Sequence, residues 1–184
     1  DVCSSDLKMQ EDRSWSDEDG TEKLAYVLET EFDFELRLGP FTWAEAWLDA
    51  FKQGGWIATL ETEHERERVE QVANGFAVWL GASDLENEAV WKWIRPAFHM
   101  TPFWSGTNTG SPVDGAYTNW NLPTGEPNNF GGNEHFGEFE ATGGWNDLSE
   151  ESTRNYIARK QLTKIETQRM RVRSEEHTSE LQSR

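Results

Sequence analysis

The sequence holds a single cysteine, Cys3, close to its first residue. One thiol cannot build a disulfide framework or a zinc–thiolate site. No stretch approaches the ~18 consecutive apolar residues that a membrane-spanning helix needs, which argues against membrane insertion. Basic residues are scarce too, because 17 Lys and Arg stand against 34 Asp and Glu, for a formal net charge of −17. Nucleic acid is therefore not an expected partner, since its phosphates need basic residues.

Both ends of the sequence have a pattern that is foreign to a protein. Residues 1–7 back-translate to GACGTGTGCTCTTCCGATCT, and the complementary strand of this DNA encodes residues 173–179. One short DNA read in both directions accounts for both ends, and it matches a sequencing-library adapter. We interpret residues 1–7 and 173–184 as adapter-derived, in a metagenomic fragment, and keep them out of fold reasoning.

The first half of the remaining chain has clear periodicity. Residues 8–31 are acidic and predict a linker or the end of a preceding domain. Residues 32–38 alternate apolar and polar positions, which predicts a strand that Gly39-Pro40 ends. Thr42 and Glu45 then form a capping box that opens a helix. The apolar stripe predicted for this helix comprises Trp43, Ala46, Trp47, Ala50 and Phe51.

A second helix starts with the same signal, Thr62 followed by Glu65, and ends at Asn74-Gly75. Strands are predicted at residues 56–60, 77–81, 90–94, 135–140, 144–148 and 155–160. Residues 95–132 show neither the periodicity of a helix nor that of a strand. A loop of this length in a compact domain is usually functional or disordered. Its aromatic residues favour an ordered, functional loop. Residues 161–172 are a polar tail without assignment. The order of elements predicts a small α+β domain over residues 32–160.

Oxygen-bearing side chains cluster in and after the irregular stretch. They are Glu126, Asn128, Glu134, Asn146 and Asp147. Calcium takes six to eight such oxygen ligands, and three carboxylates gathered without a cation would repel one another. The composition alone favours solvated loop residues in an acidic protein. A glycosidase pair formed by Glu126 and Glu134 is disfavoured, because ligation would keep both ionised and leave no acid. We therefore expect no enzyme.

Three motifs in order resemble those of the C-type lectin domain family. Ala77-Val-Trp-Leu-Gly81 is similar to its core strand motif, Glu126-Pro127-Asn128 to its sugar-selecting tripeptide, and Trp145-Asn146-Asp147 to its second calcium motif. The resemblance runs from about Phe32 to Lys160. It implies a C-type lectin-like fold, with two helices packed on small antiparallel sheets and a long irregular loop region.

The resemblance also implies a calcium-dependent sugar site. With a cis proline in the tripeptide, Glu126 and Asn128 would bind calcium and also contact sugar hydroxyls, Glu126 as hydrogen-bond acceptor and Asn128 as donor. Glu134 and Asn146 would form a second such pair, and Asp147 would complete the set. The Glu-Pro-Asn form is associated with mannose-type ligands: mannose, N-acetylglucosamine, glucose or fucose.

An auxiliary calcium site is less well matched. Asp84 and Glu88 correspond to its first ligands and Glu134 would be shared, but Asn129 and His135 stand where the family often has acidic residues. Weaker affinity for a hard cation is expected there. Asp84 and Glu88 are otherwise explained as an acidic turn.

The family's two disulfides have no cysteines here. Ala50 and Ala158 stand at the positions of one bridge, and Phe136 and Glu150 at those of the other. Each missing bridge forgoes about 2–4 kcal/mol of stabilisation. Close packing of Ala50 against Ala158, buried tryptophans and the calcium ion would compensate. In lacking these cysteines, the domain resembles bacterial members of the family more than animal ones.

Most of the ten tryptophans are predicted to be core residues. Trp104 and Trp120, in the irregular stretch, are left open between core and sugar stacking. Phe130 and His135 are candidate selectivity contacts. The predicted function is calcium-dependent glycan binding for adhesion, as part of a larger multidomain protein that is secreted or at the cell surface. The alternative is a protein-binding C-type lectin-like module in which calcium is purely structural.

Overall fold

The structure is a computed structural model that describes residues 8–9, 15–16, 23–24 and 32–161. The chain divides into two compact units, Asp1–Glu31 and Phe32–Arg184. In the first unit, β1 (Lys8–Met9), β2 (Trp15–Ser16) and β3 (Lys23–Leu24) form an antiparallel sheet that the acidic pattern did not predict. The adapter interpretation and most of the polar tail concern residues outside the described ones. The second unit contains all the elements below.

Helix α1 (Trp43–Lys52) begins as its sequence predicts. Thr42 and Glu45 form the reciprocal capping box, so this prediction is confirmed. Ala46 and Ala50 on its inner face are fully buried. The predicted stripe is wrong at Phe51, which is 54% exposed. Its ring stacks on Trp47 with centroids 5.5 Å apart, so it packs on its own helix and not into the core.

Helix α2 (Glu63–Ala73) has a half-formed capping box. The Thr62 hydroxyl accepts the N–H of Glu65 at 3.2 Å, as predicted. The Glu65 carboxylate accepts the N–H of Glu61 at 2.7 Å, one residue before the expected donor. The helix ends at Asn74 in the left-handed conformation, with φ of 49°, which confirms the predicted stop.

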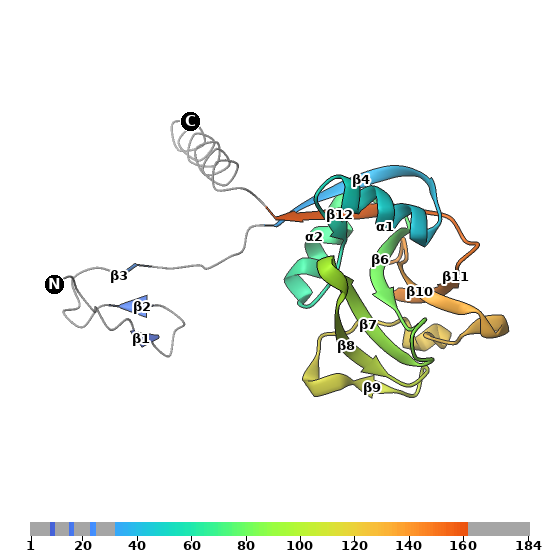
Figure 1. The fold of residues 1–184 in the computed structure, drawn as a ribbon. Coiled ribbons are helices and arrows are strands. Elements are labelled where there is room, and N and C mark those ends of the chain that lie inside the picture. Colours follow the sequence, from blue (N-terminus) through green and yellow to red (C-terminus); the bar gives the residue numbers. More distant parts are fainter. Residues whose placement is uncertain (1–7, 10–14, 17–22, 25–31, 162–184) are drawn as a thin grey trace. The chain divides into compact units, whose positions relative to one another are not determined.

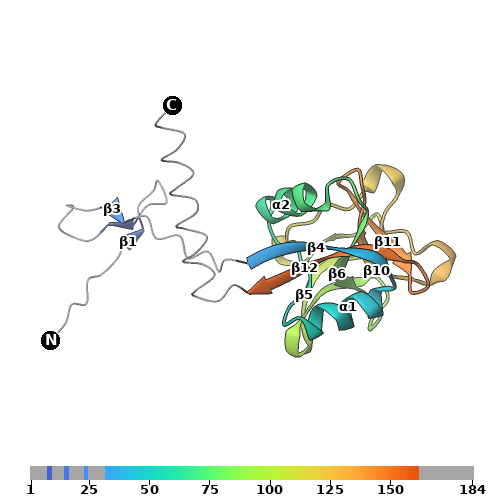
Figure 2. The same ribbon diagram turned by 90° about the horizontal axis from the view of Figure 1, so that it is seen from above.

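One long strand, β12 (Arg154–Gln161), joins the N-terminal half to the rest of the sheet. It pairs antiparallel with β4 (Phe32–Phe41) and β5 (Trp56–Ile57) and parallel with β6 (Val78–Ser83). Figure 2 shows α1 and α2 on opposite sides of the β4–β12 pair. The prediction that this strand ends at Gly39-Pro40 is wrong, because β4 continues to Phe41. It is an edge strand, where proline is tolerated, and Gly39 donates its N–H to the Asn155 side chain at 3.1 Å.

The second half of the sheet holds the remaining strands (Figure 1). β6 pairs with β10 (Glu134–Phe139) on one side and β7 (Val90–Arg95) on the other, with β11 (Trp145–Ser149) beyond β10. β8 (His99–Ser105) and β9 (Ser111–Pro112) follow β7. The prediction that residues 95–132 lack strands is wrong at β8 and at β9. Pro102 interrupts the alternation of apolar and polar residues in β8. This proline lies opposite Lys92, where the β7–β8 register shifts.

Four 3₁₀ turns shape the irregular connections: Pro96–Phe98, Val113–Gly115, Leu122–Thr124 and Phe130–Gly132. Together with two helices and a mainly antiparallel sheet, they confirm the predicted α+β class. In the described part of the chain, no helix has both the length and the apolar character needed to cross a membrane.

The core is rich in tryptophan. Trp79, Trp91, Trp93 and Trp145 are at most 2% exposed, as predicted. Trp43 and Trp47 are half-buried and pack against the cluster between α1 and β12. Ala50 and Ala158 are fully buried in this same cluster. Small side chains thus pack at the positions where the family resemblance implied a disulfide.

Candidate calcium and carbohydrate site

The Glu126-Pro127-Asn128 segment follows the 3₁₀ turn Leu122–Thr124. The Glu126–Pro127 peptide bond is cis, as the family resemblance implied. Glu126 and Pro127 are buried, whereas Asn128 is exposed. The N–H of Glu126 donates to the Asn121 carbonyl at 3.2 Å, which ties the segment to the loop before it. The tripeptide therefore presents one buried carboxylate and one solvent-facing amide.

The Glu126 carboxylate has one buried oxygen atom without a hydrogen-bond partner. Its side chain is 8% exposed, and its Oε2 atom has no hydrogen-bond partner. Burial raises its pKa to about 7, and the nearby Asp147 and Glu134 carboxylates add to the rise. Burial also raises the pKa of Glu134. A buried carboxylate with one unpaired oxygen, beside two other carboxylates, is the arrangement that a bound cation would stabilise.

Asp147 organises the backbone of the tripeptide. It lies in β11, is 1% exposed, and accepts the N–H of Asn128 through Oδ1 at 3.0 Å and the N–H of Asn129 through Oδ2 at 2.7 Å. Each carboxylate oxygen keeps a further lone pair after these bonds. Asp147 can thus orient the loop and still act as a ligand.

Glu134 is fixed from two sides at the start of β10. Its Oε2 accepts the N–H of Phe130 at 2.7 Å, and its own N–H donates to the Asn129 side chain at 3.0 Å. The turn that carries Phe130 is therefore closed onto Glu134. Phe130 itself is 78% exposed, so its ring is available to a ligand beside the carboxylates.

Asn146 is held by a residue that sequence reasoning missed. Its side-chain NH₂ donates to Glu138 at 3.2 Å. Glu138 is 4% exposed and accepts a 2.5 Å bond from Arg154. The amide oxygen of Asn146 and its second N–H remain for a ligand. Glu138, an acidic residue between Gly137 and the buried Phe139, was the signal for this supporting role.

The five predicted residues are thus only partly linked by direct contacts. Hydrogen bonds or electrostatic effects connect Glu126, Glu134, Asp147 and the Asn128 backbone, whereas Asn146 bonds to Glu138. Among the described residues, the three acidic or histidine side chains whose ligand atoms lie within 4.8 Å of one another are a different set, namely Asp84, Glu88 and His135.

That second set lies at the predicted auxiliary site. The Nδ1 atom of His135 is 3.0 Å from Oδ1 of Asp84 and 3.5 Å from Oε2 of Glu88. The Asn129 side chain donates to Glu88 at 2.6 Å. Asp84 is 2% exposed, and burial raises its pKa. His135 therefore contacts these two carboxylates, and its role as a selectivity contact stays a prediction.

Trp104 and Trp120 belong to the core. They are 3% and 6% exposed, and Trp104 donates its indole N–H to the Gly106 carbonyl at 2.9 Å. Trp120 packs edge-to-face on Trp91 with centroids 4.8 Å apart. Buried rings cannot stack on a sugar, so that option is removed. Their position in an irregular stretch concealed their burial.

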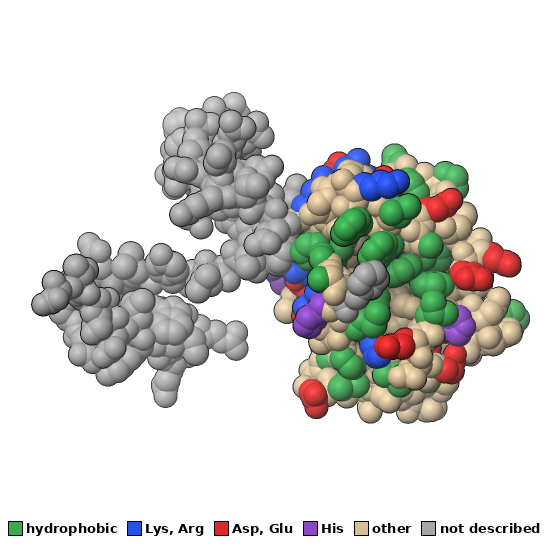
Figure 3. Space-filling view, viewed as in Figure 1, with side chains coloured by type: hydrophobic (Ala, Val, Ile, Leu, Met, Phe, Trp, Pro, Cys, Tyr) green, Lys and Arg blue, Asp and Glu red, His purple; other side chains and the backbone are tan. Residues whose placement is uncertain are grey.

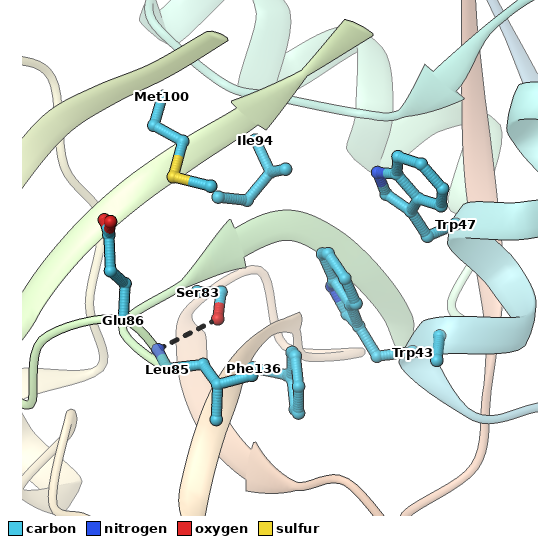
Figure 4. A pocket seen from close by; sticks show the side chains of 9 residues that line it. Trp43, Trp47, Ser83, Leu85, Glu86, Ile94, Met100 and Phe136 are labelled. Atoms are coloured by element: carbon cyan, nitrogen blue, oxygen red, sulfur yellow. Dashed lines mark hydrogen bonds between the residues drawn. The ribbon is translucent and has the colours of Figure 1, made fainter. Parts of the chain in front are cut away.

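A separate apolar pocket of about 360 Å³ lies between α1 and the strands β6–β8. Figure 4 shows Trp43 and Trp47 on one side of it and Ile94 and Met100 on another. None of the five main candidate ligands lines it. Hydrophobic side chains also gather over α1 and the neighbouring strands in Figure 3. Sequence patterns gave no sign of this pocket.

Comparison with known proteins identifies the family. The sequence model described as the lectin C-type domain matches residues 40–160. Halomucin of Haloquadratum walsbyi is 38% identical over 95 residues, which are 50% of this chain and 1% of that protein. CD209 antigen-like protein D of Mus musculus is 34% identical over 112 residues, 60% of this chain and 40% of that protein.

A solved structure shares the fold. The mouse scavenger receptor C-type lectin carbohydrate-recognition domain superposes with a TM-score of 0.56 at 24% identity, covering 72% of this chain and 90% of that one. The predicted C-type lectin-like fold is confirmed. The chain belongs to the C-type lectin domain family.

Proposed function

We propose that the domain binds carbohydrate through calcium, with mannose-type sugars as its ligands. The observation that supports this most is the buried Glu126 carboxylate, whose Oε2 atom has no hydrogen-bond partner beside Asp147 and Glu134. A buried carboxylate oxygen without a hydrogen-bond partner is costly. A divalent cation would satisfy it and offset the repulsion among the three carboxylates.

The donor set fits calcium. Glu126, Asn128, Glu134, Asn146 and Asp147 offer carboxylate and amide oxygens, the hard ligands that calcium prefers. We assign the main calcium site to these five residues. Bound calcium would supply coordination positions for sugar hydroxyls.

The neighbouring side chains would select the sugar. Asn128 is exposed and has N–H groups to donate, whereas an ionised Glu126 only accepts. Specificity then depends on where donor and acceptor sit. The Glu-Pro-Asn order supports mannose, N-acetylglucosamine, glucose or fucose over galactose.

The family supports binding and not catalysis, because C-type lectin domains are non-enzymatic carbohydrate-binding proteins. The matched regions cover 1% and 40% of the two curated relatives. We therefore propose that this domain is one part of a larger secreted or cell-surface protein, where several copies would give avidity for glycans.

A glycan array with and without chelator tests the proposal. Mannose-type glycans should bind in millimolar calcium and lose their signal in EDTA. Calorimetry on the same sample should show calcium binding. Calcium binding without any glycan signal would contradict the sugar proposal while leaving the metal site intact.

A protein-binding module with purely structural calcium is the second candidate. The apolar pocket between α1 and β6–β8 favours it, because Leu85 and Met100 at its lining are 61% and 37% exposed. If the sugar proposal holds, replacing Met100 with Lys should leave glycan binding unchanged, because this residue lies outside the main calcium site. Loss of glycan binding in that variant, with its fold intact, would place the sugar contact at this pocket instead.

A further inference from the structure

The turn after β6 and the start of β10 bring three metal-binding side chains together. Ser83 and Phe136 pair across these antiparallel strands, and Asp84 donates its N–H to the His135 carbonyl at 3.3 Å. The side chains of Asp84 and His135 therefore meet by strand register. Glu88, later in the same turn, completes a group whose ligand atoms all lie within 4.8 Å of one another.

One oxygen atom of each carboxylate already accepts a hydrogen bond from the protein. Oδ2 of Asp84 accepts the N–H of Ala89 at 2.8 Å, and Oε1 of Glu88 accepts the Asn129 amide at 2.6 Å. The other oxygen of each carboxylate faces Nδ1 of His135, at 3.0 and 3.5 Å. Three atoms thus converge: Oδ1 of Asp84, Oε2 of Glu88 and Nδ1 of His135.

This donor set does not suit the calcium ion implied for the position. Calcium takes six to eight oxygen ligands, whereas here two carboxylate oxygens and one imidazole nitrogen converge. Imidazole with carboxylate suits zinc and its neighbours in the first transition series. Three protein ligands with one position left open is a common four-coordinate zinc arrangement.

The supporting contacts also match what such a site needs. Ligating groups are normally oriented by further hydrogen bonds, and here the Ala89 N–H holds Asp84 while Asn129 holds Glu88. Asp84 is 2% exposed, so its orientation is set by the fold, and Glu88 is exposed enough to leave an entry path.

We infer that Asp84, Glu88 and His135 form a site for a borderline divalent metal, for which zinc is the probe, and that this site rejects calcium. The inference is independent of the proposed sugar function, because it uses a different set of ligands. Metal binding at Nδ1 requires that the ring of His135 carry its proton on Nε2.

Calorimetry of the full chain with zinc chloride alone tests the inference. Cys3 is replaced by serine in every sample, because a free thiol binds zinc. We expect one zinc site that His135→Gln weakens about 10-fold or more. His99→Gln, which removes a histidine from β8, is the matched control and should leave the affinity unchanged. Glu126→Gln should also leave it unchanged, since that residue belongs to the main carboxylate set.

Circular dichroism verifies the fold of each variant. Should His135→Gln fail to fold, Glu88→Gln carries the test, because Glu88 lies in an exposed turn and Gln keeps an acceptor for Asn129. Equal zinc affinity in wild type and in the folded ligand variant would overturn the inference. So would zinc binding that is lost in Glu126→Gln, or a second calcium that is lost in Glu88→Gln.

Discussion

Oδ2 of Asp147 accepts the backbone N–H of Asn129 at 2.7 Å. Through this bond, and the bond from Asn128 to Oδ1, one buried carboxylate fixes the loop that carries the Glu126-Pro127-Asn128 tripeptide. Asn129 also donates its side-chain amide to Glu88. Asn129 therefore hydrogen-bonds to both the main carboxylate set and the histidine-containing set.

Replacing Asp147 with Asn should weaken calcium binding at least about 10-fold, because affinity depends on the number of charged ligands. The amide also has one oxygen for two backbone donors, so the free energy of unfolding should fall by about 1–3 kcal/mol. Calorimetry and thermal unfolding measure the two effects. Asp114→Asn, in the exposed turn Val113–Gly115, is the control and should change neither. A folded Asp147→Asn variant with normal calcium affinity would remove Asp147 from the ligand set.

Exchanging the donor and acceptor of the tripeptide should change the preferred sugar. In the double variant Glu126→Gln with Asn128→Asp, the amide and the carboxylate swap positions while the charge stays the same. We expect loss of mannose-type binding and some gain of galactose binding on a glycan array. Calcium binding and the melting temperature serve as controls. Retained mannose preference in a calcium-bound variant would contradict selection by these two side chains.

A buried ion pair next to α2 should control stability without touching the site. Arg159 is 6% exposed and donates to Glu65 at 2.5 Å and to the Thr59 carbonyl at 2.9 Å. Burial lowers the pKa of its guanidinium, and the Glu65 and Glu61 carboxylates oppose this effect. Glu65→Gln should cost about 2–4 kcal/mol of unfolding free energy.

Chemical denaturation measures this loss, and Glu67→Gln on the exposed side of the same helix should cost less than about 0.5 kcal/mol. Glycan and calcium affinities should be unchanged in both variants under conditions where they are folded. Equal stability of the two variants would show that Glu65 does not support Arg159.

Local patterns predicted the helices well because their signals are short-range. Thr42 with Glu45, and Asn74 in its left-handed conformation, act within one turn of the chain. β8 was missed because Pro102 interrupts the alternation, although pairing with β7 tolerates it at a shifted register. Trp104 and Trp120 were undecided because burial in an irregular segment depends on distant partners such as Trp91.

The candidate ligands could be chosen from residue type and order, but their surroundings could not. The bond from Asn146 to Glu138 depends on the β10–β11 register, in which these residues are directly paired. The meeting of His135 with Asp84 depends on the β6–β10 register in the same way. Sequence spacing carries no information on such cross-strand neighbours until the pairing is known.

Calcium should stabilise the domain more strongly as the pH rises. Burial raises the pKa of Glu126 from its usual 4.5 to about 7 in the folded, calcium-free protein. The unfolded chain then loses this proton more readily than the folded one, so the contribution of Glu126 to stability is fully present below about pH 4.5 and is lost as the pH rises through about 7. Calcium reverses the direction in which Glu126 changes stability with pH, because calcium binds the ionised carboxylate. The melting-temperature increase on adding calcium should therefore be larger at pH 8 than at pH 5.5, and calcium affinity should fall up to about 10-fold per unit below pH 7. Thermal unfolding in calcium and in EDTA across this range gives the measurement, with Glu126→Gln as the variant in which the pH dependence should flatten. An equal increase in melting temperature on adding calcium at both pH values, in the wild type, would show that Glu126 does not bind the metal.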